Sequence, residues 1–195
     1  MKVLVACEFS GIVREAFAAK GHDAWSCDLL PTDIPTGHHY QGDVLHFIDL
    51  WKWDLMIAHP PCTHLAVSGA AWFSKKKLEQ KRALNFVQDL MDADIPRIAI
   101  ENPVSIISTR IRKPDQIIQP YQFGEPVKKT TCLWLKNLPK LKPTKLVKPK
   151  ITTLKTGARF STWDYKISMN HKERAHLRSI TFKGIAQAMA SQWGN

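Results

Sequence analysis

The sequence predicts an α/β fold built around a parallel sheet. Along the first two-thirds of the chain, apolar runs of strand length alternate with segments of helical spacing, which is typical of parallel strands joined by helices. Several of these runs end at glycine or proline, which marks the element boundaries. The length of 195 residues, with 44% hydrophobic and 23% charged residues, fits one domain that can bury a core.

Nothing in the sequence indicates a membrane or secreted protein. No run approaches the ~18 apolar residues of a membrane span. The start "MKVLVACEFSG" has one lysine and an interrupting glutamate, unlike a signal peptide. We therefore expect a cytoplasmic protein. Its cysteines lack C-x-x-C spacing and favour reduced thiols: Cys7, Cys27, Cys62 and Cys132.

The first elements follow in order from the amino terminus. Residues 2–7 ("KVLVAC") predict a strand. A helix follows, capped by Ser10 and ending near Gly21. Residues 23–27 predict a second strand, and a loop rich in proline, glycine and histidine leads to "YQGDV" (40–44), a short third strand or turn.

The middle of the chain continues the alternation. Residues 53–58 ("WDLMIA") predict a fourth strand, which the two following prolines must end because they fix φ and remove backbone donors. Residues 75–93 have apolar residues near helical spacing and predict a helix. Residues 97–102 ("RIAIEN") predict a fifth strand, again ended by proline.

The last third changes character. "TTCLWL" (130–135) predicts a strand and "FKGIAQAMASQW" (182–193) a closing helix, with a lysine- and proline-rich run between them. The net charge is +11, and no acidic residue occurs from 126 to 162. A block of one sign with interleaved aromatic residues favours contact with a phosphate backbone over a merely solvated face. Its cations are Lys128, Lys129, Lys136, Lys140, Lys142, Lys145, Lys148, Lys150, Lys155 and Arg159.

Three strand ends point to a nucleoside-containing cofactor. In "CEFSG" the first strand turns through Gly11 into a helix start, where a ligand can approach the backbone and negative charge is favoured. Asp28 ends the second strand, where an acidic residue can bond ribose hydroxyls. Asp43, in "GDV", could accept from an adenine amino group. Each feature is also common without a ligand, so the indication comes from their combination.

The most informative pair is Cys62 and Glu101, at the ends of the fourth and fifth strands. Neighbouring strands are spaced by ~4.8 Å, which puts their ends roughly 5–10 Å apart. A thiol and a carboxylic acid facing one pocket suit covalent catalysis, in which the thiolate attacks and the acid manages a substrate proton. The alternative is that Cys62 is a small apolar filler.

These residues, in this order, resemble the DNA cytosine-5 methyltransferases, which use S-adenosylmethionine. The chain is similar in particular to the short methylase-like proteins of bacteriophages and prophages, over about residues 1–135 and 174–194. The matching motifs are Phe9–Ser10–Gly11 in the cofactor loop, the acidic residues Asp28 and Asp43, the proline–cysteine motif of Pro60, Pro61, Cys62 and Gly69, the pair Glu101–Asn102, and Gly184 in the closing helix.

The resemblance implies a Rossmann-like class I S-adenosylmethionine-dependent methyltransferase fold, with a catalytic domain at 1–135 and 174–195 and a short DNA-contacting segment at 136–173. It implies that Cys62 adds to C6 of a flipped-out cytosine, C5 takes the methyl group, and Glu101 holds and protonates N3. We expect a nearby cation or helix end to lower the thiol pKa. Cofactor contacts are expected from Phe9, Ser10, Gly11, Asp28, Asp43, Pro60 and Gly184, and DNA contacts from Asn102, Lys128, Lys129, Thr131, Lys140, Lys142 and Lys145.

The chain departs from the family pattern at several positions. The usual glutamine after the cysteine is Thr63, and the usual valine after glutamate–asparagine is Pro103. No glutamine–x–arginine motif is recognisable, and Lys129 or Thr131 is the candidate to replace its arginine. The target-recognition region is reduced to about 137–173, which predicts low or very short sequence specificity and leaves room for a helper protein or a non-duplex substrate.

Two other functions stay open. "HPPC" also resembles the Asp/Asn–Pro–Pro–aromatic motif of exocyclic-amine methyltransferases, which stack the base on an aromatic residue where this chain has Cys62. The missing arginine motif and the short recognition region also fit a non-catalytic DNA-binding protein with the same fold. His59, Cys62 and His64 lie close enough in sequence for zinc, but no fourth ligand is apparent, and we expect no metal.

Overall fold

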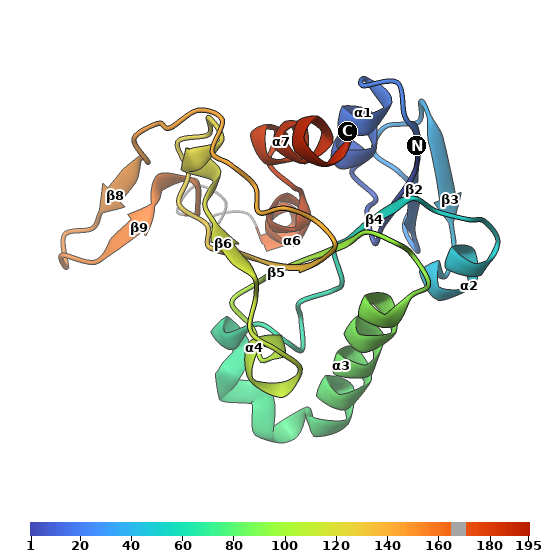
Figure 1. Cartoon of the computed structure of the whole chain (residues 1–195). Helices are drawn as coiled ribbons and strands as arrows, with labels where there is room; N and C mark the ends of the chain where they lie inside the picture. The colour runs from blue at the N-terminus through green and yellow to red at the C-terminus, as the bar shows by residue number, and fades with distance from the viewer. Residues whose placement is uncertain (165–170) are drawn as a thin grey trace.

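A seven-stranded sheet of order β3-β2-β1-β4-β5-β7-β6 forms the centre of the molecule (Figure 1). The computed structural model describes residues 1–164 and 171–195, apart from the side chains of Trp72, His171 and Lys172. The strands of the sheet are β1 (Lys2–Ala6), β2 (Asp23–Asp28), β3 (His38–Gln41), β4 (Leu55–Ala58), β5 (Ile98–Pro103), β6 (Gln116–Ile118) and β7 (Thr131–Lys136).

The strand directions confirm the predicted α/β class. The first five strands, β1 to β5, are all parallel and follow the 3-2-1-4-5 order of doubly wound, dinucleotide-binding sheets. Only β7 runs antiparallel, between β5 and β6. The run "TTCLWL" was predicted as a strand without a direction, because an apolar run carries no information on strand direction.

Helices cover both faces of this sheet (Figure 1). Alternate residues of a strand point to opposite faces, so Val3 and Val5 pack with α1 and α7, whereas Leu4 and Ala6 pack with α2 and α3. The α-helices are α1 (Ile12–Ala18), α2 (Val44–Asp49), α3 (Lys77–Asp92), α4 (Ile107–Arg110), α6 (His171–Ser179) and α7 (Lys183–Trp193), and two 3-10 helices are η1 (Val67–Lys75) and η2 (Pro120–Gln122).

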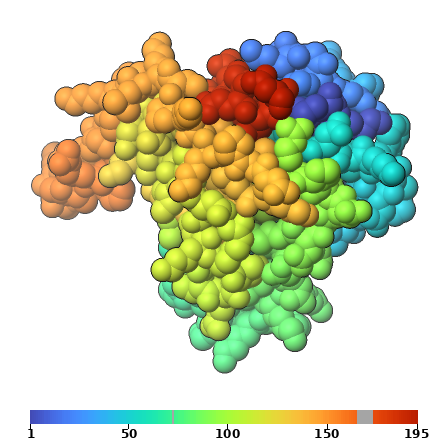
Figure 2. All heavy atoms as spheres, in the orientation of Figure 1, coloured from blue at the N-terminus to red at the C-terminus, as the bar shows by residue number. Residues whose placement is uncertain are grey.

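The basic segment from 136 onward begins as part of this core. Leu141 is buried against it, and the backbone of Lys142 exchanges hydrogen bonds with the Gln192 amide on α7. The chain then passes η2 and projects as an antiparallel hairpin of β8 (Ile151–Thr153) and β9 (Arg159–Ser161) (Figures 1 and 2). Residues 165–170 of the predicted DNA-contacting segment lie outside the described residues. Among the described helices, none combines the length and apolarity needed to cross a membrane.

Candidate active site

The ends of β4 and β5 lie side by side, as predicted for Cys62 and Glu101. Ala58 pairs with Ile100 at the end of the parallel ladder, so the residues that follow both strands lie at the same edge of the sheet. The buried Asn102 side chain donates to the Pro60 carbonyl at 2.8 Å and fixes the proline turn before Cys62. Asn102, which was predicted to contact DNA, therefore makes a hydrogen bond that supports the proline turn.

The loop after Cys62 is tied to the loop after Glu101. The Cys62 carbonyl accepts from the amide of Leu65 at 3.0 Å, which turns the chain back. The next residues meet the second loop through a bridge between Ala66 and Ser105 and a bond from the Val67 amide to the Val104 carbonyl at 3.1 Å. The surroundings of both side chains are therefore one rigid unit.

Glu101 is held by a histidine that the sequence indicated only as a doubtful zinc ligand. His59 Nδ1 lies 3.0 Å from Glu101 Oε2, and the two side chains are only 8% and 19% exposed. Burial alone would raise the pKa of the Glu101 carboxyl, but the hydrogen bond and charge of His59, with the charge of Lys129, hold it below its ordinary value. Glu101 is therefore ionised at neutral pH.

The environment of Cys62 differs from the expectation. Although the residue reaches solvent, the atoms packed around its thiol raise the pKa by desolvation, and the Glu101 carboxylate raises it further. Lys129 and Arg178 act in the opposite direction and do not outweigh them. The expected cations are present, but the prediction of a lowered thiol pKa was wrong for the free protein.

Lys129 is the cation that reaches both members of the pair. Its Nζ donates to the Arg178 carbonyl at 2.7 Å and lies over the rings of Trp163 and Phe182. Burial lowers the pKa of this ammonium group, while Glu101 and Cys62 both raise it, which places Lys129 in their electrostatic field. The other candidate, Thr131, is buried at the start of β7, where its hydroxyl donates to the Lys129 carbonyl at 3.3 Å.

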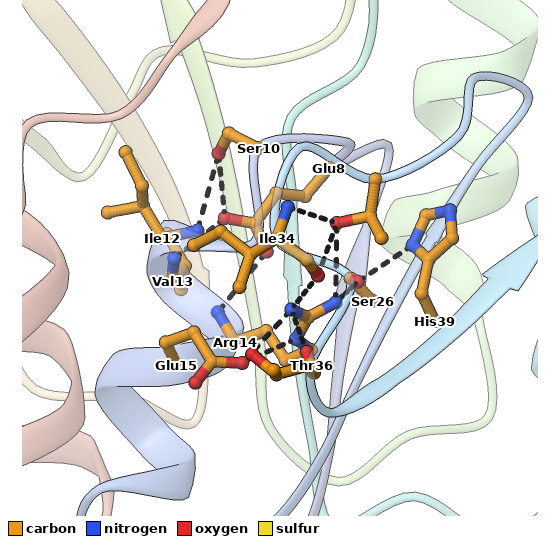
Figure 3. Close-up of polar contacts among 11 residues, drawn as sticks. Glu8, Ser10, Ile12, Val13, Arg14, Glu15, Ser26, Ile34, Thr36 and His39 are labelled. Atoms are coloured by element: carbon orange, nitrogen blue, oxygen red, sulfur yellow. Dashed lines mark hydrogen bonds and ion pairs between the residues drawn. The ribbon is translucent and has the colours of Figure 1, made fainter.

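The turn after β1 is closed by an unpredicted carboxylate. Glu8, only 4% exposed, accepts from the Val13 amide at 2.7 Å and from the Arg14 amide at 3.2 Å at the start of α1 (Figure 3). Burial raises the pKa of Glu8, and these bonds partly oppose the rise. The predicted cap, Ser10, donates to Glu8 at 3.2 Å and accepts from the Ile12 amide at 3.4 Å, but Gly11 is the residue that precedes the helix. A carboxyl group of the chain, Glu8, therefore occupies the helix start where a negatively charged ligand was expected.

A fully buried arginine fastens the loop after β2 onto this turn. Arg14 donates to the Ser26 hydroxyl at 3.0 Å and to the carbonyls of Ile34 and Thr36 at 2.8 and 2.6 Å (Figure 3). Gly11 has φ of 71°, and a Cβ there would lie 2.8 Å from Arg14 Nη2. These contacts account for Gly11 without a bound ligand.

The other predicted cofactor residues meet at the same sheet edge. Asp28 and Asp43 both act on the buried Cys27 thiol, whose pKa is raised to about 12 by burial and then by these carboxylates. Asp28 also accepts from the Leu30 amide, and Asp43 caps α2 by accepting from the Leu45 amide, each at 2.9 Å.

The remaining cofactor-loop residue, Phe9, is covered by α6. Its ring centroid lies 4.9 Å from that of His176, and His176 Nε2 lies 3.1 Å from Asp33 Oδ2. Helix α6 therefore reaches from the β1 turn to Lys129, which bonds the carbonyl of its Arg178.

The last predicted cofactor residue, Gly184, has a packing role. Its amide donates to Glu125 at 2.7 Å, and a Cβ there would lie 1.8 Å from the Phe123 carbonyl oxygen. This close approach of α7 explains the glycine without a cofactor contact.

The predicted DNA-binding lysines are divided between the two edges of the sheet. Lys128 and Lys129 precede β7 at the edge of Cys62. Lys142 lies beside Gln192, next to Trp193, whose carbonyl accepts from Arg97 just before β5. Lys140 and Lys142 are thus placed toward the opposite edge. Lys145 lies between the two edges, and its amide donates to the Gln122 carbonyl. In the described part of the chain, no group of three or more His, Cys, Asp or Glu residues is arranged to hold a metal ion.

No protein-family model matches the sequence, and a comparison with curated proteins finds no match. Three solved structures are similar in fold. A chain encoded within an E. coli prophage and assigned as a DNA modification methyltransferase has 16% identity and a TM-score of 0.49, with 76% of this chain and 52% of that chain covered. A Spodoptera frugiperda DNMT2 variant has 13% identity and a TM-score of 0.49, with 77% and 57% covered. The 16S rRNA methylase RmtB has 16% identity and a TM-score of 0.37, with 69% and 54% covered.

The fold is Rossmann-like, as predicted, because five parallel strands in the order 3-2-1-4-5 are covered by helices on both faces. The chain spans about half the length of each of these solved structures. Its activity, substrate and partners are therefore matters of proposal.

Proposed function

We propose that the protein is an S-adenosylmethionine-dependent DNA cytosine-5 methyltransferase, with Cys62 as nucleophile and Glu101 as the residue that holds the base at N3. The observation that carries this proposal is the meeting of a thiol, a largely buried carboxylate and a half-buried cation, Lys129, where β4, β5 and β7 lie side by side. An exocyclic-amine enzyme would need an aromatic residue at the place of Cys62.

The residues at the ends of β1 to β3 fit the nucleoside part of the methyl donor. Asp28 and Asp43 offer carboxylates at the ends of β2 and β3, and β1 alone lies between β2 and β4, the strand that leads to Cys62. Carboxylates suit ribose hydroxyls and an adenine amino group. When bound there, S-adenosylmethionine supplies an electrophilic methyl group.

The chain's own groups would prepare the cytosine. The Cys62 thiol gives its proton to the Glu101 carboxylate, the sulfur bonds C6, the ring electrons move to C5, and Glu101 passes the proton to N3, to which it stays hydrogen-bonded. After C5 takes the methyl group, a base removes the C5 proton and the Cys62–C6 bond breaks. Because the Cys62 pKa is raised and Glu101 is ionised in the free protein, the thiolate and the N3 proton must both arise as the base binds.

A cationic cleft offers a place for the DNA backbone on the same side as the pair. It has a volume of about 650 Å³ and lies between η1, α3 and α4, with Lys77, Lys81 and Arg110 in its lining. None of the described residues that line it is acidic. Both η1 and α4 follow directly from the linked loops after Cys62 and Glu101. Phosphate contacts here would position DNA without reading its sequence.

Covalent trapping tests the proposal. DNA containing 5-fluorocytosine should form a stable complex with the wild-type protein and S-adenosylmethionine, because fluorine at C5 cannot leave as the proton does. Cys62→Ala should bind the same DNA without a covalent bond. Modification of an amino group without trapping would indicate the exocyclic-amine chemistry. Tight DNA binding with neither modification nor trapping would indicate a non-catalytic binding protein.

A further inference from the structure

We propose that His59 is a positioning residue for Glu101: its imidazole fixes one carboxylate oxygen so that the other faces the target base. This inference rests on the proposed function and assigns a role to a side chain outside the predicted site. In sequence, His59 stands directly before the proline–cysteine motif. Its place is therefore set by the same turn that presents Cys62.

The geometry suits a fixed support. The His59 amide donates to the Ala6 carbonyl at 2.9 Å, which joins it to β1, and its side chain is only 8% exposed. Nδ1 contacts Glu101 Oε2 at 3.0 Å. Because His59 takes Oε2, Oε1 is the oxygen left for N3 of the base. The two residues leave adjacent strands, so the contact needs no long, mobile side chain.

The second ring nitrogen indicates which tautomer is present. Within the described structure, His59 Nε2 is buried and has no hydrogen-bond partner. A buried N–H without an acceptor costs about 1–3 kcal/mol. In either charge state of the imidazole, Nδ1 therefore carries a proton, which it donates to the ionised Glu101 carboxylate. This donor keeps the same oxygen occupied whether Oε1 is bare or carries the proton shared with N3.

The charges around the imidazole define its effect on pH dependence. His59 acts electrostatically on two carboxylates, Glu101 and the buried Glu8. Lys129, just before β7, also acts on Glu101. Since His59 lowers the pKa of Glu101, its loss should leave a buried carboxyl with a raised pKa. The limb of the kcat/KM profile that reports Glu101 should then move to higher pH.

Two substitutions separate positioning from general damage. His59→Asn keeps a donor near the place of Nδ1, whereas His59→Leu keeps volume and loses the donor. We expect His59→Leu to lower kcat on the order of 100-fold, the effect of misplacing a reacting group by about 1 Å. His59→Asn should recover a large part of that loss, with S-adenosylmethionine affinity unchanged in both.

A titration of the free protein makes the test independent of turnover. The ¹³C shift of the Glu101 carboxyl, assigned with Glu101→Gln, should titrate at higher pH in His59→Leu than in the wild type. His64→Leu is the matched control, because His64 lies beyond Cys62 and its Nδ1 also has no partner among the described residues. An unchanged Glu101 titration in folded His59→Leu would overturn the inference, as would equal kcat for His59→Leu and wild type. If the wild type neither traps nor methylates DNA while the titration shifts as expected, the proposed function fails and the His59–Glu101 coupling stands.

Discussion

Cys62 lies among groups that act on its thiol in opposite directions. Desolvation and Glu101 raise the pKa, whereas Lys129 and Arg178 lower it. The free protein therefore keeps the thiol largely protonated, which protects it from oxidation and alkylation. The Glu101 carboxylate is one of the groups that raise the thiol pKa. Binding of the base would engage Glu101, and its negative charge would then no longer act against ionisation of Cys62.

Replacing Lys129 by Met should make the thiol still less acidic. The substitution keeps the length of the side chain and removes a cation that lowers the Cys62 pKa. Because the thiolate is the reactive form, alkylation of Cys62 by iodoacetamide at neutral pH should slow severalfold. Each unit by which the thiol pKa rises would slow it by about tenfold. The pH dependence of the alkylation rate measures this directly.

Lys128→Met is the control, because Lys128 is the exposed neighbour of Lys129 and is not among the groups that act on Cys62. An alkylation profile that is the same in Lys129→Met and Lys128→Met would contradict the role of Lys129.

At the residue scale, sequence reasoning put Cys62 and Glu101 at neighbouring strand ends, because a topological rule places parallel strand ends together, and the pairing of β4 with β5 confirms that neighbourhood. It missed the supporting residues His59 and Glu8. Their roles depend on where a side chain points within a turn, and neighbouring letters such as "AHPPC" do not specify that direction.

At the scale of elements, close packing explains two of the predicted ligand glycines, against a side chain at Gly11 and against backbone at Gly184. The turn before α1 holds Gly11 against Arg14, and the start of α7 holds Gly184 against the Phe123 carbonyl. A motif glycine can thus record the approach of two protein segments as well as the approach of a ligand.

Gly184→Ala should therefore destabilise the protein. A Cβ only 1.8 Å from the Phe123 carbonyl oxygen forces α7 to move, because that atom belongs to the backbone and cannot rotate away. We expect a loss of about 1–3 kcal/mol in the free energy of unfolding, the usual range for overpacking. Urea denaturation followed by circular dichroism measures it.

Gly69→Ala is the matched control, because a Cβ there meets no atom within 4 Å and its φ is not positive. Equal stability of Gly184→Ala and Gly69→Ala would show that the contact of α7 with Phe123 is not tight.

The elements themselves were predictable where their sequence pattern is long. Strands β1, β2, β4, β5 and β7 and helices α1, α3 and α7 appear near the predicted residues, because each has apolar residues bounded by glycine, proline or polar residues, whereas β3 ends at Gln41, within the predicted strand or turn of 40–44. Helix α2, strand β6 and the hairpin β8–β9 are three to six residues long. Elements this short show less than two helical turns or two strand repeats, so periodicity cannot distinguish them from loops.

For the molecule as a whole, the net charge of +11 indicated a polyanionic partner, but linear sequence could not place the contact surface. The lysine- and proline-rich segment spreads from one sheet edge to the other and leads into the hairpin, which projects from the molecule in Figure 2. The cleft cations come from two helices, α3 and α4, that are separated in sequence. Only the fold brings them beside the Cys62 loop.

Neutralising the cleft should weaken DNA binding more than neutralising the far edge. Three cleft substitutions, Lys77→Gln, Lys81→Gln and Arg110→Gln, should together reduce the slope of log K against log salt by about 2–3, roughly one for each lost phosphate contact. The double variant Lys140→Gln/Lys142→Gln should change that slope by less than one. Fluorescence anisotropy over a salt series measures both, and a larger effect of the double variant would place the DNA on the opposite edge.

The most direct test of the central claim is nucleoside mass spectrometry of DNA from cells that express the wild-type protein or Cys62→Ala. The host strain should lack cytosine methylation of its own. The proposed chemistry predicts 5-methyldeoxycytidine with the wild type and none with Cys62→Ala. Equal 5-methyldeoxycytidine in both strains, or a methylated exocyclic amine in place of it, would contradict the assignment of Cys62 as the nucleophile of a cytosine-5 methyltransferase.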